Sequence, residues 1–355
     1  MRVLQVTSSS QRRGAEVFAQ QLGEELRNRG HEVRTVAFRS DGTGPGLGFM
    51  ELPAGRFSPA VLHALTSHAR WSQVVVSHGG STLQSVAIAS ALARRPFAYR
   101  NIGDPSHWGA ARLSRLRIGL PLRRATGVAA LYDSAASYLV EHYGIHRGRI
   151  SVLGNAVPAQ DFPSATVEDR AAARARLGLA AGVPVIGYLG ALAPEKRPSW
   201  MIDVAVRLDG VVVAVAGDGP LRAEMSRSAA GVAGSARLHV LEPPTDPATF
   251  LRAVDVLAVP STTEGVPAVV LEAALTGTPV VATAVGGVTD TMRSLDFGRT
   301  VPRDDLEGFI DALRQVLARP GEFTADRARV VEAHDLGSVA TRWESFLNGI
   351  VDQDR

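Results

Sequence analysis

The sequence contains no cysteine, which excludes disulfide bonds and thiolate metal sites and fits a reducing compartment. No apolar run approaches the roughly 20 residues that a membrane-spanning helix needs. The first residues, Met1–Thr7, read directly as a β-strand, so no signal peptide is expected. These absences together predict a cytoplasmic protein.

Acidic pairs of the kind that hold a divalent metal are also scarce. An Asp-x-Asp motif occurs once, at Asp352-Gln-Asp354, in the C-terminal tail rather than at a strand end. No metal and no cofactor are therefore expected. The turn after the first strand, Ser8–Gly14, lacks the G-x-G-x-x-G pattern, which argues against a nicotinamide-dependent oxidoreductase.

Lysine is almost absent. Lys196 is the single lysine among the 38 basic residues, and the other 37 are arginine. It stands in a loop just after the apolar strand expected at Val183–Leu189. Loops at the C-terminal ends of parallel strands bind ligands in α/β folds, and a lysine there suits a phosphate.

Charge is unevenly divided along the chain. Residues 1–160 carry a balance of +10 and residues 161–355 a balance of −7. The basic half is expected to meet an anionic surface or substrate, and no nucleic acid partner is predicted. The segment Arg112–Arg124 has five arginines, five large aliphatic residues and no acid. Two interpretations of it stay open: peripheral contact with the inner face of a membrane, or a solvated basic helix face.

Both halves alternate apolar strands with helices, which predicts parallel sheets covered on both faces. We expect an α/β protein with two Rossmann-like domains facing a central cleft. The predicted domains are residues 1–160 and 170–335, joined by a linker at 158–169, with a C-terminal helix in 336–355 that returns to the first domain. The strands expected are 2–7, 32–37, 74–76, 97–100, 127–131, 183–189, 211–216, 237–241, 255–259 and 279–282, and the last helices are 306–318 and 338–350.

Two carboxylates flank a Gly-x-Pro turn in Glu264-Gly-Val-Pro-Ala-Val-Val-Leu-Glu272. If both belonged to one helix that has Pro267 in its first turn, they would lie within about 80° of each other and roughly 12 Å apart along the axis. That arrangement would suit two hydroxyl-bearing parts of an elongated ligand such as a nucleotide-sugar. The alternative is an ordinary capped helix with two unrelated acids.

The second half resembles the donor domain of the retaining glycosyltransferases of family 4, which have the GT-B fold. Five motifs match in order: the Gly190…Lys196-Arg197 loop, Gly217-Asp-Gly-Pro-Leu-Arg222, Ala253-Val-Asp-Val-Leu-Ala-Val-Pro-Ser261, the glutamate pair, and Gly277-Thr-Pro…Gly286-Gly287. The first half matches more weakly, through Arg13-Gly14-Ala15-Glu16, Ser77-His78 and Gly154-Asn155.

The resemblance implies roles for these positions. Glu264 would contact the donor sugar, Glu272 the ribose, and Lys196 the diphosphate leaving group. His78 would lie near the anomeric carbon and is a catalytic candidate together with Lys196 and Glu264. The other donor-binding candidates are Gly14, Gly190, Arg197, Gly265, Val266 and Pro267, with Gly286 and Gly287 as phosphate-loop candidates. Asp104, His107 and Trp108 are the acceptor candidates.

The sequence departs from the family pattern at three places, one of which is Asp290, where glutamate is commoner. Ala191 replaces an arginine that is common after the glycine of the lysine loop, so Arg197 is a candidate substitute. Glu242-Pro-Pro replaces a glycine expected near the nucleobase.

The function expected from the resemblance is retaining, metal-independent transfer of a hexose from a nucleoside diphosphate sugar, with UDP-sugar as the default donor. The acceptor is unknown: a lipid-linked saccharide, a polysaccharide or a small-molecule aglycone. A UDP-sugar epimerase of similar fold and a non-catalytic nucleotide-sugar binding protein remain alternatives.

Overall fold

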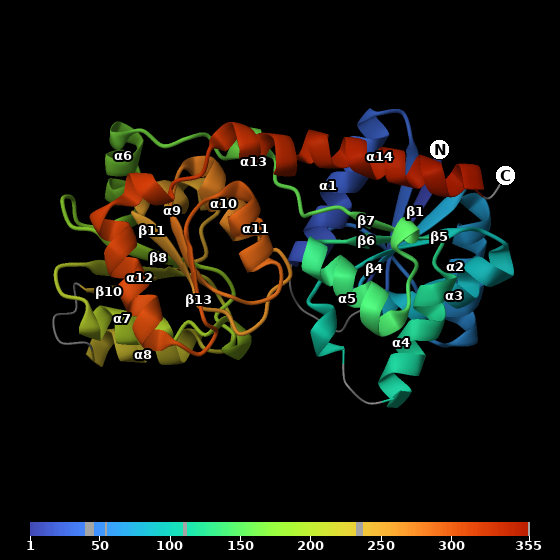
Figure 1. Ribbon diagram of the computed structural model, residues 1–355, viewed down its shortest axis with the longest axis horizontal. Helices are drawn as coiled ribbons and strands as arrows, with labels where there is room; N and C mark the ends of the chain where they lie inside the picture. The colour runs from blue at the N-terminus through green and yellow to red at the C-terminus, as the bar shows by residue number, and fades with distance from the viewer. Residues whose placement is uncertain (40–45, 54, 109–111, 232–236, 354–355) are drawn as a thin grey trace. The chain divides into compact units, whose positions relative to one another are not determined.

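Two fully parallel β-sheets, one in each half of the chain, organise the fold of this computed structural model. The structure describes residues 1–39, 46–53, 55–108, 112–231 and 237–353, with the side chains of all these except residues 112–115. The chain divides into unit 1, which comprises Met1–Ala156 and Leu336–Arg355, and unit 2, which comprises Val157–Asp335 (Figure 1). The predicted linker at 158–169 lies inside unit 2, where it forms the 3₁₀-helix η3 (Ala159–Asp161) and the start of α6.

The sheet of unit 1 has seven strands in the order β3-β2-β1-β4-β5-β6-β7. Its strands are β1 Arg2–Thr7, β2 Glu32–Ala37, β3 Met50–Glu51, β4 Val74–His78, β5 Phe97–Arg100, β6 Gly127–Ala130 and β7 Ile150–Val152. Its helices are α1 Gly14–Asn28, α2 Pro59–Trp71, α3 Gly80–Ala93, α4 Arg112–Arg124, α5 Asp133–Tyr143 and α14 Leu336–Gln353. The strand order reverses between β1 and β4, where the registers pair Gln5 with both Thr35 and Val76.

The sheet of unit 2 has six strands in the order β10-β9-β8-β11-β12-β13. Its strands are β8 Val185–Leu189, β9 Val212–Ala216, β10 Leu238–Leu241, β11 Val256–Val259, β12 Val280–Thr283 and β13 Arg299–Val301. Its helices are α6 Val167–Leu177, α7 Trp200–Arg207, α8 Arg222–Gly231, α9 Pro247–Ala253, α10 Ala268–Thr276, α11 Val288–Leu295, α12 Leu306–Ala318 and α13 Arg327–His334. The order reverses between β8 and β11, and ligands of such sheets bind beside the reversal, at the carboxyl ends of the strands.

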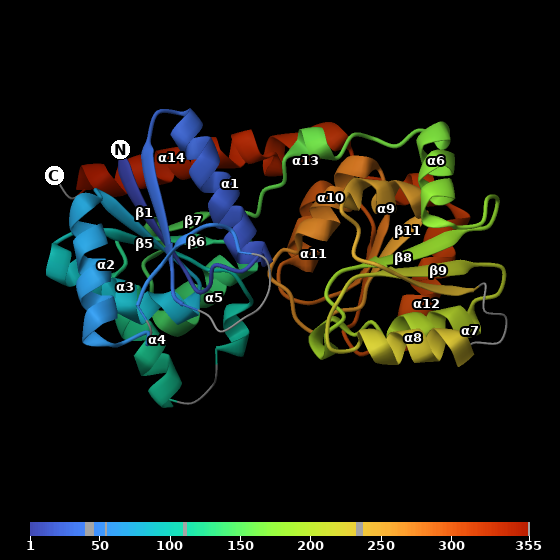
Figure 2. The same cartoon turned by 180° about the vertical axis from the view of Figure 1, so that it is seen from behind.

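The C-terminal helix α14 belongs to unit 1, where it lies along α1 (Figure 2). Trp343 is fully buried and its ring centroid lies 6.2 Å from that of Phe18. At the end of α1, Arg29 donates to the Glu344 carboxylate at 3.4 Å. The prediction that the last helix returns to the first domain agrees with this packing.

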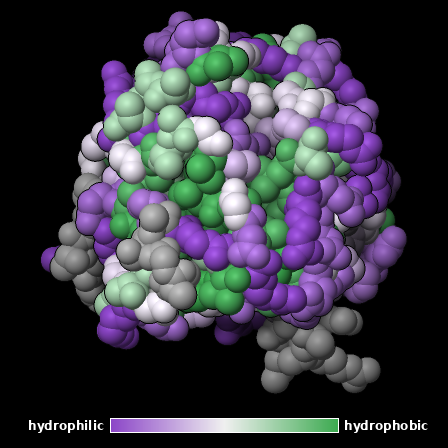
Figure 3. Space-filling view, turned by 90° about the vertical axis from the view of Figure 1, so that its left-hand side faces the viewer, coloured by the Kyte–Doolittle hydropathy of each residue, from purple (hydrophilic) through white to green (hydrophobic). Residues whose placement is uncertain are grey.

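Exposed hydrophobic residues are scattered on unit 2. Among the described residues of unit 2, the large hydrophobic side chains that are exposed are those of two separate valines, Val167 and Val206. The side of unit 2 seen in Figure 3 correspondingly mixes hydrophobic with hydrophilic residues. No described helix in either unit combines the length and the apolarity that crossing a bilayer requires.

Candidate functional site

Two loops meet at the point where the strand order of unit 2 reverses. The first follows β8 and runs from Gly190 to the 3₁₀-helix η4 (Pro194–Lys196). The second follows β11 and carries Ser261 and Glu264. They are joined by two hydrogen bonds from Thr262, whose amide and hydroxyl donate to the Glu195 carbonyl at 2.8 and 3.1 Å. The topology therefore places Lys196 beside Glu264 although 68 residues separate them.

Lys196 and Glu264 form an ion pair. Lys196 Nζ donates to Glu264 Oε2 at 2.7 Å, and Ser261 Oγ donates to Glu264 Oε1 at 2.7 Å. The Glu264 side chain is 8 % exposed and the Lys196 side chain 30 % exposed. The carboxylate is thus fixed by two donors, while the ammonium group keeps hydrogens that face solvent and can bind an anion.

Glu264 and Glu272 do not share a helix, contrary to the helical arithmetic above. Helix α10 begins at Ala268, and Pro267 is its N-cap residue, with an extended backbone (φ −70°, ψ 130°) rather than a helical one. Glu264 therefore belongs to the preceding loop, and only Glu272 projects from the helix. Pro267 disfavours a helical conformation at Val266, and the buried side chain of Val266 anchors the loop.

The Gly286-Gly287 turn packs directly on the Glu264 loop. A Cβ atom on Gly286, whose φ is +51°, would lie 1.8 Å from the Glu264 carbonyl oxygen, so only glycine fits there. The Gly287 amide donates to the Gly265 carbonyl at 2.8 Å. The two glycines thus hold the Glu264 loop in place, and their contact with a phosphate stays a prediction.

A pocket of about 380 Å³ opens beside these loops, and Glu272 lines it. Its lining is otherwise largely apolar or backbone: Leu189, Gly190, Ala191, Gly217, Asp218, Pro243, Pro244, Pro247 and Val269. Glu272 is only partly exposed to it, and burial raises the pKa of this carboxyl to about 7. The pocket therefore offers a largely apolar cleft with two carboxylates, Glu272 and the exposed Asp218, as hydrogen-bond acceptors.

Two further segments complete this lining. The Gly217-Asp-Gly-Pro turn, one of the motifs that match the family, precedes α8, and its first two residues line the pocket. A Cβ atom on Gly217 would lie 1.8 Å from the Gly190 carbonyl oxygen, so this glycine allows the two loops to touch. Pro243 and Pro244, from the unusual segment after β10, form another wall.

Tyr188 connects the pocket to the ion pair. Its hydroxyl donates to the carbonyl of Ala191, a pocket residue, at 2.7 Å. Burial, with the nearby Glu264 and Glu195 carboxylates, raises the pKa of Tyr188 above its usual range.

The side chain of Arg197 is bound to other partners: its guanidinium donates to the Arg303 carbonyl at 2.6 Å and to Asp304 at 2.8 Å. A phosphate contact by Arg197 would require these bonds to break.

In unit 1, His78 ends β4 and is 1 % exposed. The Gln5 amide donates to the Ala19 carbonyl at 2.8 Å, so its oxygen faces His78 Nε2 at 2.9 Å and accepts that hydrogen. The unprotonated Nδ1 then faces Arg100 Nη1 at 3.4 Å. Burial, and next the charge of Arg100, hold the pKa of His78 well below its usual range. His78 is a neutral, enclosed group, and its catalytic role stays a prediction.

Gly14 is the first residue of α1 and is exposed, as the phosphate-loop prediction requires. Of the acceptor candidates, Asp104 and His107 form a pair with 3.3 Å between Oδ2 and Nδ1. Trp108 packs edge-on against Tyr99 and Tyr143, with ring centroids 6.0 and 5.5 Å away.

Asn101, directly after β5, was missed by the sequence analysis. It is fully buried, and its amide faces the Tyr99 hydroxyl without a hydrogen bond of ordinary geometry from either group. A buried amide without partners is costly, which makes Asn101 a candidate contact for a bound molecule.

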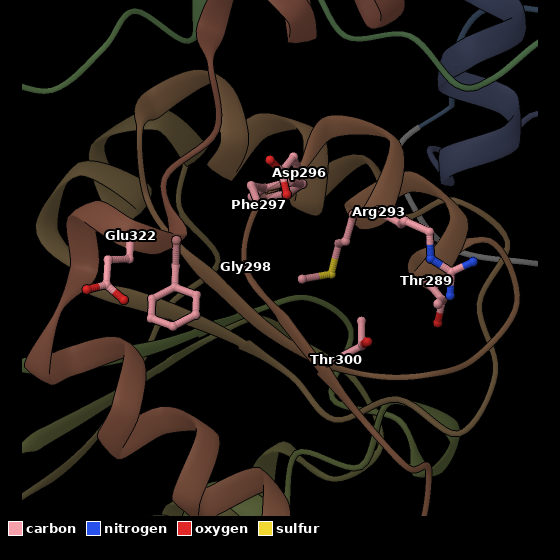
Figure 4. A pocket seen from close by; sticks show the side chains of 9 residues that line it. Thr289, Arg293, Asp296, Phe297, Gly298, Thr300 and Glu322 are labelled. Atoms are coloured by element: carbon pink, nitrogen blue, oxygen red, sulfur yellow. The ribbon is translucent and has the colours of Figure 1, made fainter.

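A second cavity of unit 2, of about 300 Å³, lies along α11 and next to the 3₁₀-helix η5 (Pro320–Phe323). Figure 4 shows Thr289 and Arg293 on one side of it and Glu322 on the other. It contains none of the residues that the sequence assigned to a ligand. We therefore regard the pocket at Glu272 as the primary site.

No metal-binding site is evident among the described residues. In the described ranges, no three His, Asp or Glu side chains converge as a metal site would require. Asp354, from the Asp-x-Asp motif of the tail, lies outside the described residues.

Both units match family models of glycosyltransferases. Residues 183–319 match the "Glycosyl transferases group 1" model, and residues 13–156 match the "Glycosyl transferase 4-like domain" model. The chain belongs to the group 1, family 4 glycosyltransferases. Relatives named D-inositol 3-phosphate glycosyltransferase include one from Mycolicibacterium paratuberculosis, 34 % identical over 57 % of this chain and 47 % of that protein. Another, from Mycobacterium tuberculosis, is 36 % identical over 62 % of this chain and 46 % of that protein. The chain spans about half the length of the curated relatives it matches.

Solved structures share the GT-B fold of this chain. Anabaena HepE in complex with UDP superposes with a TM-score of 0.84 at 19 % identity, over 98 % of this chain and 100 % of that one. Its complex with UDP-glucose superposes with a TM-score of 0.81 at 20 % identity, over 98 % of this chain and 100 % of that one. Sucrose-phosphate synthase from Thermosynechococcus elongatus superposes with a TM-score of 0.82 at 18 % identity, over 99 % of this chain and 100 % of that one.

Proposed function

We propose that this glycosyltransferase moves a hexose from a UDP-sugar to a phosphate-bearing acceptor, with retention of anomeric configuration and without a metal. The observation that carries the proposal is the joint placement of the Lys196–Glu264 pair and the Glu272 pocket at the strand reversal of unit 2. The ammonium of Lys196 matches the diphosphate of one donor molecule, the fixed carboxylate of Glu264 matches its sugar, and the largely apolar cleft at Glu272 matches its nucleoside.

The Glu272 pocket is assigned to the nucleoside. Its proline walls offer flat apolar surfaces to a base, and Glu272 accepts hydrogen bonds from two ribose hydroxyls when it is ionised. UDP is favoured because the similar HepE structure is a complex with UDP or UDP-glucose. No residue in the lining is specific for uracil, so the base preference comes from this likeness.

Lys196 is assigned to the diphosphate. As the bond between sugar and phosphate breaks, negative charge grows on the leaving group, and the nearby ammonium stabilises that charge. Its partner Glu264 then accepts hydrogen bonds from sugar hydroxyls in place of one bond to Lys196. In this arrangement the lysine supplies the positive charge that a divalent metal supplies in other transferases.

The acceptor is assigned to unit 1 by charge. The +10 balance of residues 1–160 favours an anionic acceptor, and the curated relatives carry names that specify an inositol phosphate. We propose a hydroxyl-bearing acceptor with a phosphate group, either soluble or lipid-linked. Catalysis by His78 would follow the family resemblance, while the bonds of His78 to Gln5 and Arg100 favour a positioning role.

The test is a product analysis with UDP-, GDP- and ADP-sugars, each with soluble inositol phosphate and with a lipid-linked phosphate acceptor. We expect transfer from a UDP-sugar, an unchanged anomeric configuration in the product, and equal rates with and without EDTA. Conversion of the UDP-sugar without an acceptor would identify an epimerase. UDP-sugar binding without any conversion would identify a binding protein. Loss of activity in EDTA with recovery in magnesium would refute the metal-free assignment.

A further inference from the structure

Helices α3 and α4 of unit 1 expose an apolar surface that the donor site does not use. They adjoin each other, and Gln84 Nε2 of α3 donates to the Arg117 carbonyl of α4 at 3.3 Å (Figure 1). The described residues include eight large exposed hydrophobic side chains, and half of them are on these two helices. They are Ile88, Leu92, Leu116 and Leu120, which are 43, 61, 58 and 61 % exposed.

The four residues form two pairs, each one helical turn apart. On α4, steps of 100° per residue place Leu120 between Leu116 and Arg124 on the exposed face. The opposite face carries the fully buried Leu122. Leucines thus occupy the centre of the outward face of α4, although water rather than protein covers them.

The chain segment that carries these residues is basic, and the exposed acids nearest to it in sequence on the adjoining helix α5 are Asp133 and Glu141. Neither helix contains an aspartate or glutamate, and Asp104 is the single acid between Gly80 and Tyr132. Asp104 already accepts a hydrogen bond from the Ser106 amide at 2.9 Å. Arg117 and Arg124 are exposed beside the leucines. The side chains of Arg112 and Arg115 lie outside the described part of the chain and are not needed for this inference.

We propose that Ile88, Leu92, Leu116 and Leu120, with Arg117 and Arg124, form a docking surface for an anionic lipid bilayer, and we call it the α3–α4 surface. Aliphatic side chains can enter the boundary between headgroups and acyl chains while the guanidinium groups bind lipid phosphates. A soluble anionic acceptor would account for the arginines but not for the exposed leucines. A nucleic acid would favour aromatic side chains, and the surface has none.

The test is sedimentation of the full chain with vesicles of phosphatidylglycerol and phosphatidylcholine, and with phosphatidylcholine alone. We expect binding to the anionic vesicles at about 20 mM salt, where screening is weak, and release at about 500 mM. Arg117→Ser with Arg124→Ser should weaken binding about fivefold per arginine. Leu116→Ser with Leu120→Ser leaves the charge unchanged and should weaken it about tenfold or more.

The matched control is Val167→Ser with Val206→Ser, which alters two exposed hydrophobic residues of unit 2 and should bind vesicles as the wild type does. Thermal unfolding and UDP calorimetry, unchanged in every variant, establish that the fold and donor site are intact. The proposal is overturned if the wild type does not sediment at low salt, if neutral vesicles bind equally, or if the leucine variant binds like the wild type. None of those results would affect the donor assignment, because the residues tested are not in the donor site.

Discussion

The carboxyl group of Glu272 should make both the stability and the ligand affinity of this protein depend on pH. Burial raises its pKa from 4.5 to about 7 in the folded chain. Because the folded state holds the proton more tightly than the unfolded state, the free energy of unfolding falls as pH rises from 4.5 to about 7 and then stays level. At about 1.4 kcal/mol per pH unit, the total is at most about 3 kcal/mol, since water in the pocket reaches part of the side chain.

Glu272→Gln removes this titration with almost no change of shape. The variant should be more stable than the wild type by up to about 3 kcal/mol at pH 8, and by less than about 1 kcal/mol at pH 5. Urea denaturation at the two pH values measures the difference. An equal gain at both would show that the gain does not come from ionisation of Glu272.

The affinity for a ligand should rise with pH, whereas the free energy of unfolding falls. Uridine is the suitable probe, because it presents the base and ribose without phosphates that titrate in the same range. The ionised carboxylate accepts both ribose hydroxyls, so wild-type affinity for uridine should rise by up to about tenfold per pH unit between pH 5 and 7. Glu272→Gln should bind more weakly with little pH dependence. If calorimetry shows the same slope in both proteins, Glu272 does not bind the ribose.

Three further substitutions test other parts of the site. Lys196→Ala should weaken UDP binding about 10- to 100-fold by calorimetry, the worth of a charge-assisted hydrogen bond, and leave uridine binding unchanged. Equal loss for both ligands would contradict a phosphate role. Gly286→Ala should destabilise the chain by about 1–3 kcal/mol in urea and abolish UDP binding, because its Cβ would overlap the Glu264 carbonyl. Gly14→Ala, with nothing within 4 Å of its Cβ, is the control for stability. Asn101→Leu removes a buried amide without partners, so the melting temperature should hold or rise while transfer falls at least tenfold. Full activity in that variant would leave Asn101 without a functional role.

Much of the fold was predictable because most strands are short, buried apolar runs between turn signals. The bounds of β1, β2 and β5 agree with those expected from the sequence. The strands β3, β7 and β13 were missed: each has two or three residues and lies at the edge of its sheet, and β13 begins with the exposed Arg299. A short edge strand pairs on one side only, so its sequence needs little apolar character. Because β13 was not predicted, the helix expected at 306–318, which is α12, had no strand before it.

The site was predicted in its residues more than in its geometry. Lys196 and Glu272 became candidates because one is the single lysine and the other is an acid within an apolar segment. The Lys196–Glu264 pair could not be derived locally, since it depends on β8 and β11 being neighbours. The resemblance placed the segment Glu242-Pro-Pro near the nucleobase, but the sequence alone did not indicate that Pro243 and Pro244 form a pocket wall. Asn101 gave no signal at all, because an unpaired amide is visible only once its surroundings are known.

Helix α14 has a consequence for the order in which the protein is built. It packs Val339, Trp343 and Leu347 into the same cluster as Phe18 and Leu22 of α1, so a segment that is synthesised after unit 2 completes the core of the first unit. All of unit 2, Val157–Asp335, is made in the interval. The nascent N-terminal sheet must therefore wait, with that apolar face uncovered, while an entire second unit leaves the ribosome. Unit 2 is continuous in sequence and can fold before its neighbour, which reverses the usual precedence of the N-terminal half.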